Sequence, residues 1–192
     1  MVRPVPLTLF RGDGFSGWRS LNDTIMGGRS QGHCHIGSWG LELTANLVAQ
    51  GGGFVSVRSP VLDPPLDLSG YDAFRLTLRG DGRRYKFAVA CADPISRASE
   101  LIPGGLRWVK DFTSQAEGTT LVVLPFQDLA PVVRANPVGI PLRFSPDRIR
   151  RLQLLHSRFS DDGGKNPGFA AGPLRLTLLG IDAIRATEAA AG

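Results

Sequence analysis

The sequence predicts an all-β protein, an antiparallel β-sandwich of the jelly-roll type. Apolar and polar residues alternate along many short stretches, and clusters of Gly, Pro, Asp and Asn separate these stretches. No stretch carries the apolar stripe of a convincing amphipathic helix of three turns. About eight to ten strands without intervening helical patterns favour an antiparallel sandwich over a parallel sheet.

The alternation is clearest in three stretches. "DAFRLTLRG" places apolar residues of the range 74–79 on one face of a strand, "YKFAVACA" does the same over 85–91, and "LRLTLLGIDAI" alternates over 174–184. Each pattern is typical of a half-buried strand. Short turns are expected near 14–21 and 126–131. The remaining predicted strands are 39–48, 53–61, 106–113, 119–126 and 148–156.

A tight hairpin turn is predicted at Asp81-Gly82, which lies between two of these alternating stretches. This pair of residues suits the positive φ angles of a type I′ turn, so we expect the two flanking strands to pair with each other. Gly80, Asp81 and Gly82 do not form a phosphate loop, because no helix follows to supply an N-terminal dipole.

Length and composition indicate one soluble globular domain. The chain has 192 residues, of which 42% are hydrophobic and 20% charged, and no apolar run approaches the length of a membrane span. We expect a single sandwich domain over residues 1–186 and a flexible tail over 187–192. The first residues lack the pattern of a secretion signal, and two cysteines make no disulfide framework. We therefore expect a cytoplasmic protein in which Cys34 and Cys91 are small buried apolar residues.

Motifs for nucleotide, metal or catalytic chemistry are weak. "GDGFSG", residues 12–17, matches a dinucleotide-binding pattern by letter, but no helical stripe follows it. His33 and His35 lie on one face of a strand, yet a metal site needs a further ligand and His156 is the only other histidine. Asp161-Asp162 fits a surface turn better than a calcium loop. We expect no metal, no cofactor and no enzymatic activity.

The stretch "NDTIMGGRSQG", residues 22–32, requires an explanation, because it is too polar for a core strand and too rich in glycine for a helix. It begins inside the first of four motifs. "WRSLNDTIMGGRS" from Trp18 is followed by motifs at 51–59, 71–87 and 123–132. In this order and spacing they closely resemble the complex I intermediate-associated protein 30 family. The most specific parts are Asn22-Asp23-x-x-Met26-Gly27-Gly28-x-Ser30 and Gly52-Gly53-Phe54-x-Ser56-x-Arg58.

The resemblance covers nearly the whole chain, from about Phe10 to Ile184. It implies a galactose-binding-like β-sandwich, in agreement with the strand pattern. Members of the family include mitochondrial assembly factors for respiratory complex I, with relatives in bacteria and plastids, and we expect a bacterial member here. The family has no established catalytic activity, so the resemblance implies a module that binds and assembles.

Two interpretations of the opening stretch remain. In the first, Asn22 and Asp23 satisfy backbone donors of their own turn, and Gly27-Gly28 permit a tight corner. In the second, polar residues of the motifs form a binding patch on loops held by the sandwich. Trp18 and Phe54 are either aromatic members of that patch or part of the core. The candidate binding residues are Trp18, Asn22, Asp23, Met26, Gly27, Gly28, Ser30, Phe54 and Arg58.

The predicted function is that of a non-catalytic interaction module. We expect a protein partner, such as a subunit of a respiratory or NAD(P)H dehydrogenase-type membrane complex, with the chain in the cytoplasm or peripheral to the membrane. The alternative is a carbohydrate- or RNA-binding module. A formal net charge of +5 permits contact with RNA or another anionic surface, although no basic tract of five or six residues is present.

Overall fold

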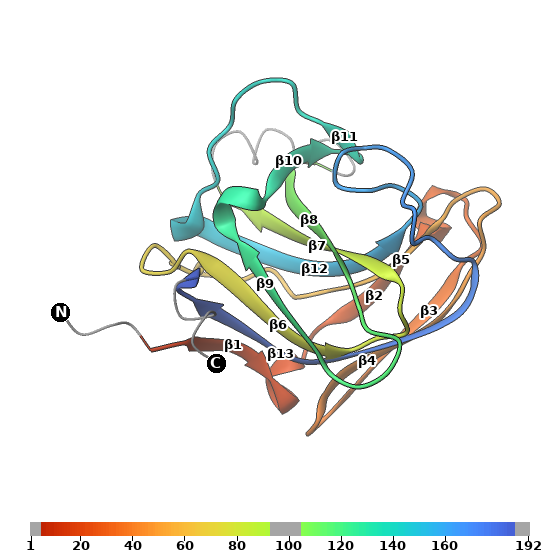
Figure 1. Ribbon diagram of the computed structural model, residues 1–192, viewed down its shortest axis with the longest axis horizontal. Coiled ribbons are helices and arrows are strands. Elements are labelled where there is room, and N and C mark those ends of the chain that lie inside the picture. Colours follow the sequence, from red (N-terminus) through yellow and green to blue (C-terminus); the bar gives the residue numbers. More distant parts are fainter. Residues whose placement is uncertain (1–4, 93–104, 187–192) are drawn as a thin grey trace.

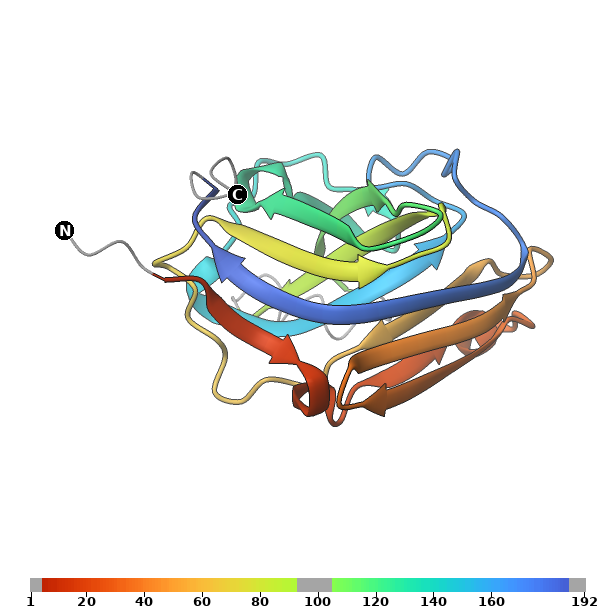
Figure 2. The same cartoon turned by 60° about the horizontal axis from the view of Figure 1, so that its bottom comes forward.

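The computed structural model describes residues 5–92 and 105–186, and within these ranges the strands form two antiparallel sheets, one of six strands and one of seven (Figure 1). The predicted tail at 187–192 lies outside the described residues. The two sheets face each other, as the view in Figure 2 shows. The all-β jelly-roll sandwich predicted from the alternation is confirmed.

The six-stranded sheet is built around one long strand, β13 (Gly172–Ile184). The first half of β13 pairs with β4 and its second half pairs with β1, while β6 lies along its other side. The other members of this sheet are β1 (Leu7–Arg11), β3 (Gln31–Gly37), β4 (Gly40–Leu47), β6 (Ala73–Arg79) and β9 (Thr120–Pro125).

The seven-stranded sheet has β12 (Ile149–Ser157) near its middle, with β7 on one side and β5 on the other. Four short 3₁₀ helices connect strands in the described residues: η1 (Gly12–Phe15), η2 (Asp23–Met26), η3 (Phe126–Asp128) and η4 (Pro146–Arg148). In spatial order the sheet contains β11 (Asn136–Pro137), β10 (Ala130–Val133), β8 (Arg107–Thr113), β7 (Arg84–Cys91), β12, β5 (Phe54–Arg58) and β2 (Arg19–Asn22).

The core fills the space between the inner faces of the two sheets. Alternate residues of the longer strands point inward, so the period-2 pattern of the sequence becomes one apolar layer. Aromatic rings pack against one another in this core: Phe74 packs on Phe87 and Phe126, and Trp18 makes edge-to-face contacts with Phe10 and Phe15. Cys91 is buried as expected, whereas Cys34 is only half-buried, and burial raises the pKa of the Cys34 thiol to about 11.

The predicted hairpin at Asp81-Gly82 is wrong. β6 and β7 belong to different sheets, and the segment between them crosses from one sheet to the other. Gly82 has a φ of +83°, as a turn glycine would, but its N–H donates to the carbonyl of Gln115, and the Asp81 carboxylate accepts a 2.8 Å bond from the Tyr85 hydroxyl. An alternating strand buries its apolar face whether it pairs with its neighbour in sequence or lies in the facing sheet. Alternation alone therefore cannot distinguish a hairpin from a crossover between sheets.

Candidate interaction surface

η2 begins a tight corner where β2 ends, and the buried carboxylate of Asp23 organises it. This carboxylate accepts a hydrogen bond from the Ser30 N–H at 3.0 Å, from the Ser30 hydroxyl at 2.7 Å and from the Gly53 N–H at 2.8 Å. The Ser30 hydroxyl oxygen also accepts a bond from the Val48 N–H at 2.9 Å. A buried carboxylate is stable only when it is hydrogen-bonded in this way. We call residues 22–30 with Gly52 and Gly53 the Asp23 corner.

Two glycines allow the chain to approach the Asp23 carboxylate closely. A Cβ atom on Gly28 would lie 2.3 Å from the Asp23 Cγ, and a Cβ atom on Gly52 would lie 2.5 Å from its Oδ2. The two most specific motifs of the sequence, one in 22–30 and the other in 52–58, are therefore parts of one structural unit. Their glycines and polar residues form a rigid, hydrogen-bonded corner.

The alternative that placed Asp23 and Ser30 in an exposed polar patch is wrong, because both residues are fully buried. Trp18 is only 4% exposed and belongs to the core, so it is not available as a surface anchor. The half-buried Asn22 donates from Nδ2 to the Gly32 carbonyl at 3.2 Å, which joins β2 to β3. These contacts support the corner interpretation of the opening stretch.

The remaining candidate binding residues lie nearer the surface. Met26 is 72% exposed at the end of η2, beside the exposed Gly27, while Gly28 is half-buried against Asp23. Phe54 and Arg58 are half-buried on β5. Because Val55 and Val57 of this strand point into the core, Phe54 and Arg58 point to the outer face of the seven-stranded sheet.

Register brings Arg58 next to two polar residues that sequence reasoning missed. Arg58 lies directly opposite Arg19 of β2 on one side and opposite Gln153 of β12 on the other. Residues directly opposite each other in an antiparallel pair point to the same face, with neighbouring strands about 4.8 Å apart. We call Arg19, Arg58 and Gln153 the arginine row. The Gln153 amide is oriented by a 2.9 Å bond from its Nε2 to the hydroxyl of Ser56.

The two guanidinium groups of the arginine row have no counter-ion among the described residues. No hydrogen bond or ion pair joins Arg19 or Arg58 to any side chain in the described part of the chain. Like charges directly opposite on neighbouring strands are destabilising. The arginine row is thus an uncompensated positive charge fixed on a rigid sheet.

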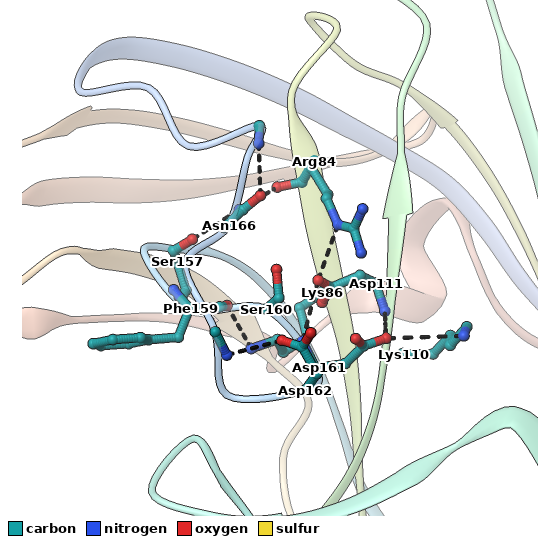
Figure 3. A network of polar contacts seen from close by, with 12 residues as sticks. Arg84, Lys86, Lys110, Asp111, Ser157, Phe159, Ser160, Asp161, Asp162 and Asn166 are labelled. Atoms are coloured by element: carbon teal, nitrogen blue, oxygen red, sulfur yellow. Dashed lines mark hydrogen bonds and ion pairs between the residues drawn. The ribbon is translucent and has the colours of Figure 1, made fainter.

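A second cluster of cationic residues, on β7 and β8, is paired with partners in the described chain (Figure 3). The Arg84 Nε atom donates to the Asp111 carboxylate at 3.0 Å, and the Lys110 Nζ atom lies 3.9 Å from the Asp161 carboxylate. The Asp111 N–H donates to Asp161 Oδ2 at 3.0 Å, and the Asp161 N–H donates to Asp111 Oδ2 at 3.2 Å. Asp161 belongs to the surface turn predicted from the sequence, and the turn is pinned to β8 by these bonds.

Lys86 lies within this cluster and is only 5% exposed. Its ammonium group donates to the Phe159 carbonyl at 2.7 Å, so the connection between β12 and β13 is held against the sheet. Burial lowers the pKa of Lys86, while the nearby carboxylates, Asp111 first, oppose that shift. The cluster is a structural element that fastens a loop, in contrast to the arginine row.

His156, the possible third ligand for a metal, lies in the core instead. Its Nδ1 lies 2.8 Å from the Arg84 carbonyl, and the Ala170 N–H donates to its Nε2 at 3.3 Å. These partners require the neutral ring with a proton on Nδ1. His33 and His35 are exposed on β3, and the described residues contain no group of three side chains suited to a metal ion.

The buried His156 is expected to make the protein less stable in mild acid. Burial lowers its pKa below the ordinary value of about 6.5, so the unfolded state binds the proton more readily. Its contribution is complete above about pH 6.5 and is lost as the pH falls toward the folded-state pKa, at no more than about 1.4 kcal/mol per pH unit. Urea unfolding of the wild type between pH 7.5 and 5 should show this loss. His156→Gln should flatten the slope, and His33→Gln should leave it unchanged; equal slopes in all three proteins would contradict the assignment.

The fold defines the class of protein, a galactose-binding-like β-sandwich. The family 11 carbohydrate-binding module of a cellulosomal cellulase of Clostridium thermocellum is similar at 16% identity over 95% of both chains, with a TM-score of 0.63. Part of an agarase is similar at 13% identity over 94% of this chain and 25% of that chain, with a TM-score of 0.56. At these identities the likeness establishes the fold alone.

The chain belongs to the complex I intermediate-associated protein 30 family, whose model matches residues 8–178. The resemblance carried by the four sequence motifs is confirmed. No curated protein sequence matches the chain. None of the helices in the described ranges is long and apolar enough to cross a membrane.

Proposed function

We propose that this protein is a non-catalytic interaction module that holds a protein partner during assembly of a respiratory or NAD(P)H dehydrogenase-type membrane complex. It acts in the cytoplasm, with peripheral contact to the membrane through that partner. Membership of the complex I intermediate-associated protein 30 family supports an assembly role. The chemistry of the described surface supports binding.

The observation that carries the proposal is the arginine row. Arg is enriched at the anchors of protein interfaces, and such anchors are most effective on rigid elements. Arg58 projects from β5, an interior strand of the seven-stranded sheet, and its backbone is fixed by pairing on both sides. The unsatisfied charge of Arg19 and Arg58 is a cost to the isolated protein that a partner's carboxylates would remove.

The assembly role is tested in cells that lack the protein. Membranes from these cells are expected to accumulate incomplete forms of the NADH dehydrogenase complex, which native electrophoresis with an in-gel activity stain resolves. Expression of the wild-type chain should restore the full-size complex. A complex of normal size and amount in cells without the protein would contradict the assembly role.

Carbohydrate binding is a second candidate, favoured by the likeness to the family 11 module, one structure of which holds a β-1,3-1,4-mixed-linked tetrasaccharide. The described outer face of the seven-stranded sheet offers little support, since Phe54 is the only aromatic residue of β5 and is half-buried. Sugar rings are usually held by an aromatic platform with polar neighbours. Retarded migration in a native gel that contains mixed-linked β-glucan, relative to a gel without it, would favour this candidate over a protein partner.

A further inference from the structure

The basic residues of the seven-stranded sheet differ in whether a partner lies beside their charged group. Arg84 and Lys110 each have a carboxylate within 4.0 Å, and Lys86 is held by a backbone carbonyl beneath the connection between β12 and β13. Arg19 and Arg58 of the arginine row, in contrast, have no carboxylate within 4.0 Å among the described residues. The charges of Arg84 and Lys110 are therefore compensated within the protein, whereas those of Arg19 and Arg58 are not.

We propose that the arginine row is a recognition site for an acidic segment of the protein partner, in which carboxylates bind between the guanidinium groups of Arg19 and Arg58. This inference rests on the interaction function proposed above and identifies its surface and its ligand chemistry. A guanidinium group presents a planar set of N–H donors that matches a carboxylate through two parallel hydrogen bonds. Two such groups on adjacent strands match two neighbouring carboxylates of an extended chain.

The surroundings of the arginine row favour a peptide over a nucleic acid. Binding of single-stranded nucleic acid combines a positive groove with aromatic rings on which bases stack. On the described outer face, Gln153 of the row donates a hydrogen bond to the neighbouring Ser56, and the small side chain of Ala88 lies opposite Gln153. Ser56 also donates to the Leu21 carbonyl at 2.6 Å. These side chains offer no stacking platform next to the arginines, and Phe54, the aromatic residue on this face of β5, lies at the other end of the strand from Arg58.

The expected geometry also explains why the site is rigid before a partner arrives. Arg19 and Arg58 are attached to paired strands, and the Asp23 corner fixes the end of β2 directly after Asn22. Binding of a partner would therefore cost little conformational entropy in this protein, because the backbone that carries the two arginines is already ordered. The Asp23 corner thus holds in place the strand β2, which carries Arg19 of the arginine row.

The test measures binding of a fluorescein-labelled peptide of alternating glutamate and serine by anisotropy at low ionic strength. Wild-type protein is expected to bind it, and a peptide with glutamine at each glutamate position should bind at least about tenfold more weakly, since charge-assisted bonds to Arg are lost. Arg58→Gln and Arg19→Gln should each weaken binding of the acidic peptide by about tenfold. Arg79→Gln, which removes an exposed arginine from the other sheet, is the matched control and should leave binding unchanged.

Three outcomes would overturn the site. The acidic peptide does not bind detectably, it binds wild type and Arg58→Gln equally, or an oligoribonucleotide of the same length binds more tightly through the same two arginines. Thermal denaturation shows whether each variant is folded, and Arg58→Lys, which keeps the charge but not the planar donors, should be intermediate. The proposed function fails separately: cells that assemble the membrane complex normally without the protein contradict it, whatever the peptide shows. Full rescue of assembly by Arg58→Gln overturns only the arginine row.

Discussion

Replacing Asp23 with alanine is expected to lower the free energy of unfolding by about 3 to 5 kcal/mol. The substitution removes an acceptor from two backbone N–H groups, those of Ser30 and Gly53, and from the Ser30 hydroxyl. All three donors lie in a buried site, and each unsatisfied donor costs on the order of 1 to 3 kcal/mol, with losses that are not additive. Chemical denaturation monitored by tryptophan fluorescence measures the change.

Asp13→Ala is the matched control for this prediction. Asp13 is an exposed carboxylate on η1, and its removal should change stability by less than about 0.5 kcal/mol. Asp23→Asn keeps the shape of the side chain but replaces one carboxylate oxygen with an NH2 group, which faces other donors. This variant should therefore also be strongly destabilised. Equal unfolding midpoints for Asp23→Ala and wild type would show that the corner does not depend on the carboxylate.

Gly28→Ala is the second substitution with a large expected effect, about 2 to 4 kcal/mol of lost stability. The φ angle of Gly28 is not in the left-handed region, so the backbone itself would accept alanine. The obstacle is the Asp23 side chain, whose Cγ would lie 2.3 Å from the new Cβ and cannot move without breaking its hydrogen bonds.

Gly27→Ala separates this steric effect from backbone strain. Gly27 has a φ of +84° and open space where a Cβ would lie. Alanine there should lower the stability only through the strain of the left-handed conformation, about 1 to 2 kcal/mol. In the Asp23→Ala background the cost of Gly28→Ala should shrink, because the Cγ and carboxylate oxygens are gone, whereas the cost of Gly27→Ala should not change. A Gly28→Ala cost that is the same in both backgrounds would contradict the contact.

Much of the fold could be predicted from the sequence because strands with one apolar face that points into the core leave a local signature. The alternation in 74–79, 85–91 and 174–184 corresponds to β6, β7 and β13, whose apolar residues line the core. Strands without that signature were missed. β2 (Arg19–Asn22) has no fully buried residue, and its strand character depends on pairing with β5, a partner more than thirty residues away.

Less of the candidate site could be predicted from the sequence. Arg58 was selected from its motif, but its neighbours Arg19 and Gln153 are defined by strand register, which no local pattern encodes. The surface placement considered for Asp23 failed for a related reason. A polar stretch normally indicates exposure, and the signal for burial was the combination of Gly28, Ser30 and the second glycine motif, which only the folded chain brings together.

The position of β13 constrains when the chain can fold during its synthesis. It is the last strand of the described chain, yet it lies inside the six-stranded sheet, where β1, β4 and β6 all pair with it. A ribosome adds only about 5 to 20 residues per second, so these earlier strands spend seconds without their common partner. Their unpaired edges are exposed to chaperones and to one another in that interval. Folding to the native state must therefore wait until the residues of β13 have been synthesised and have left the ribosome.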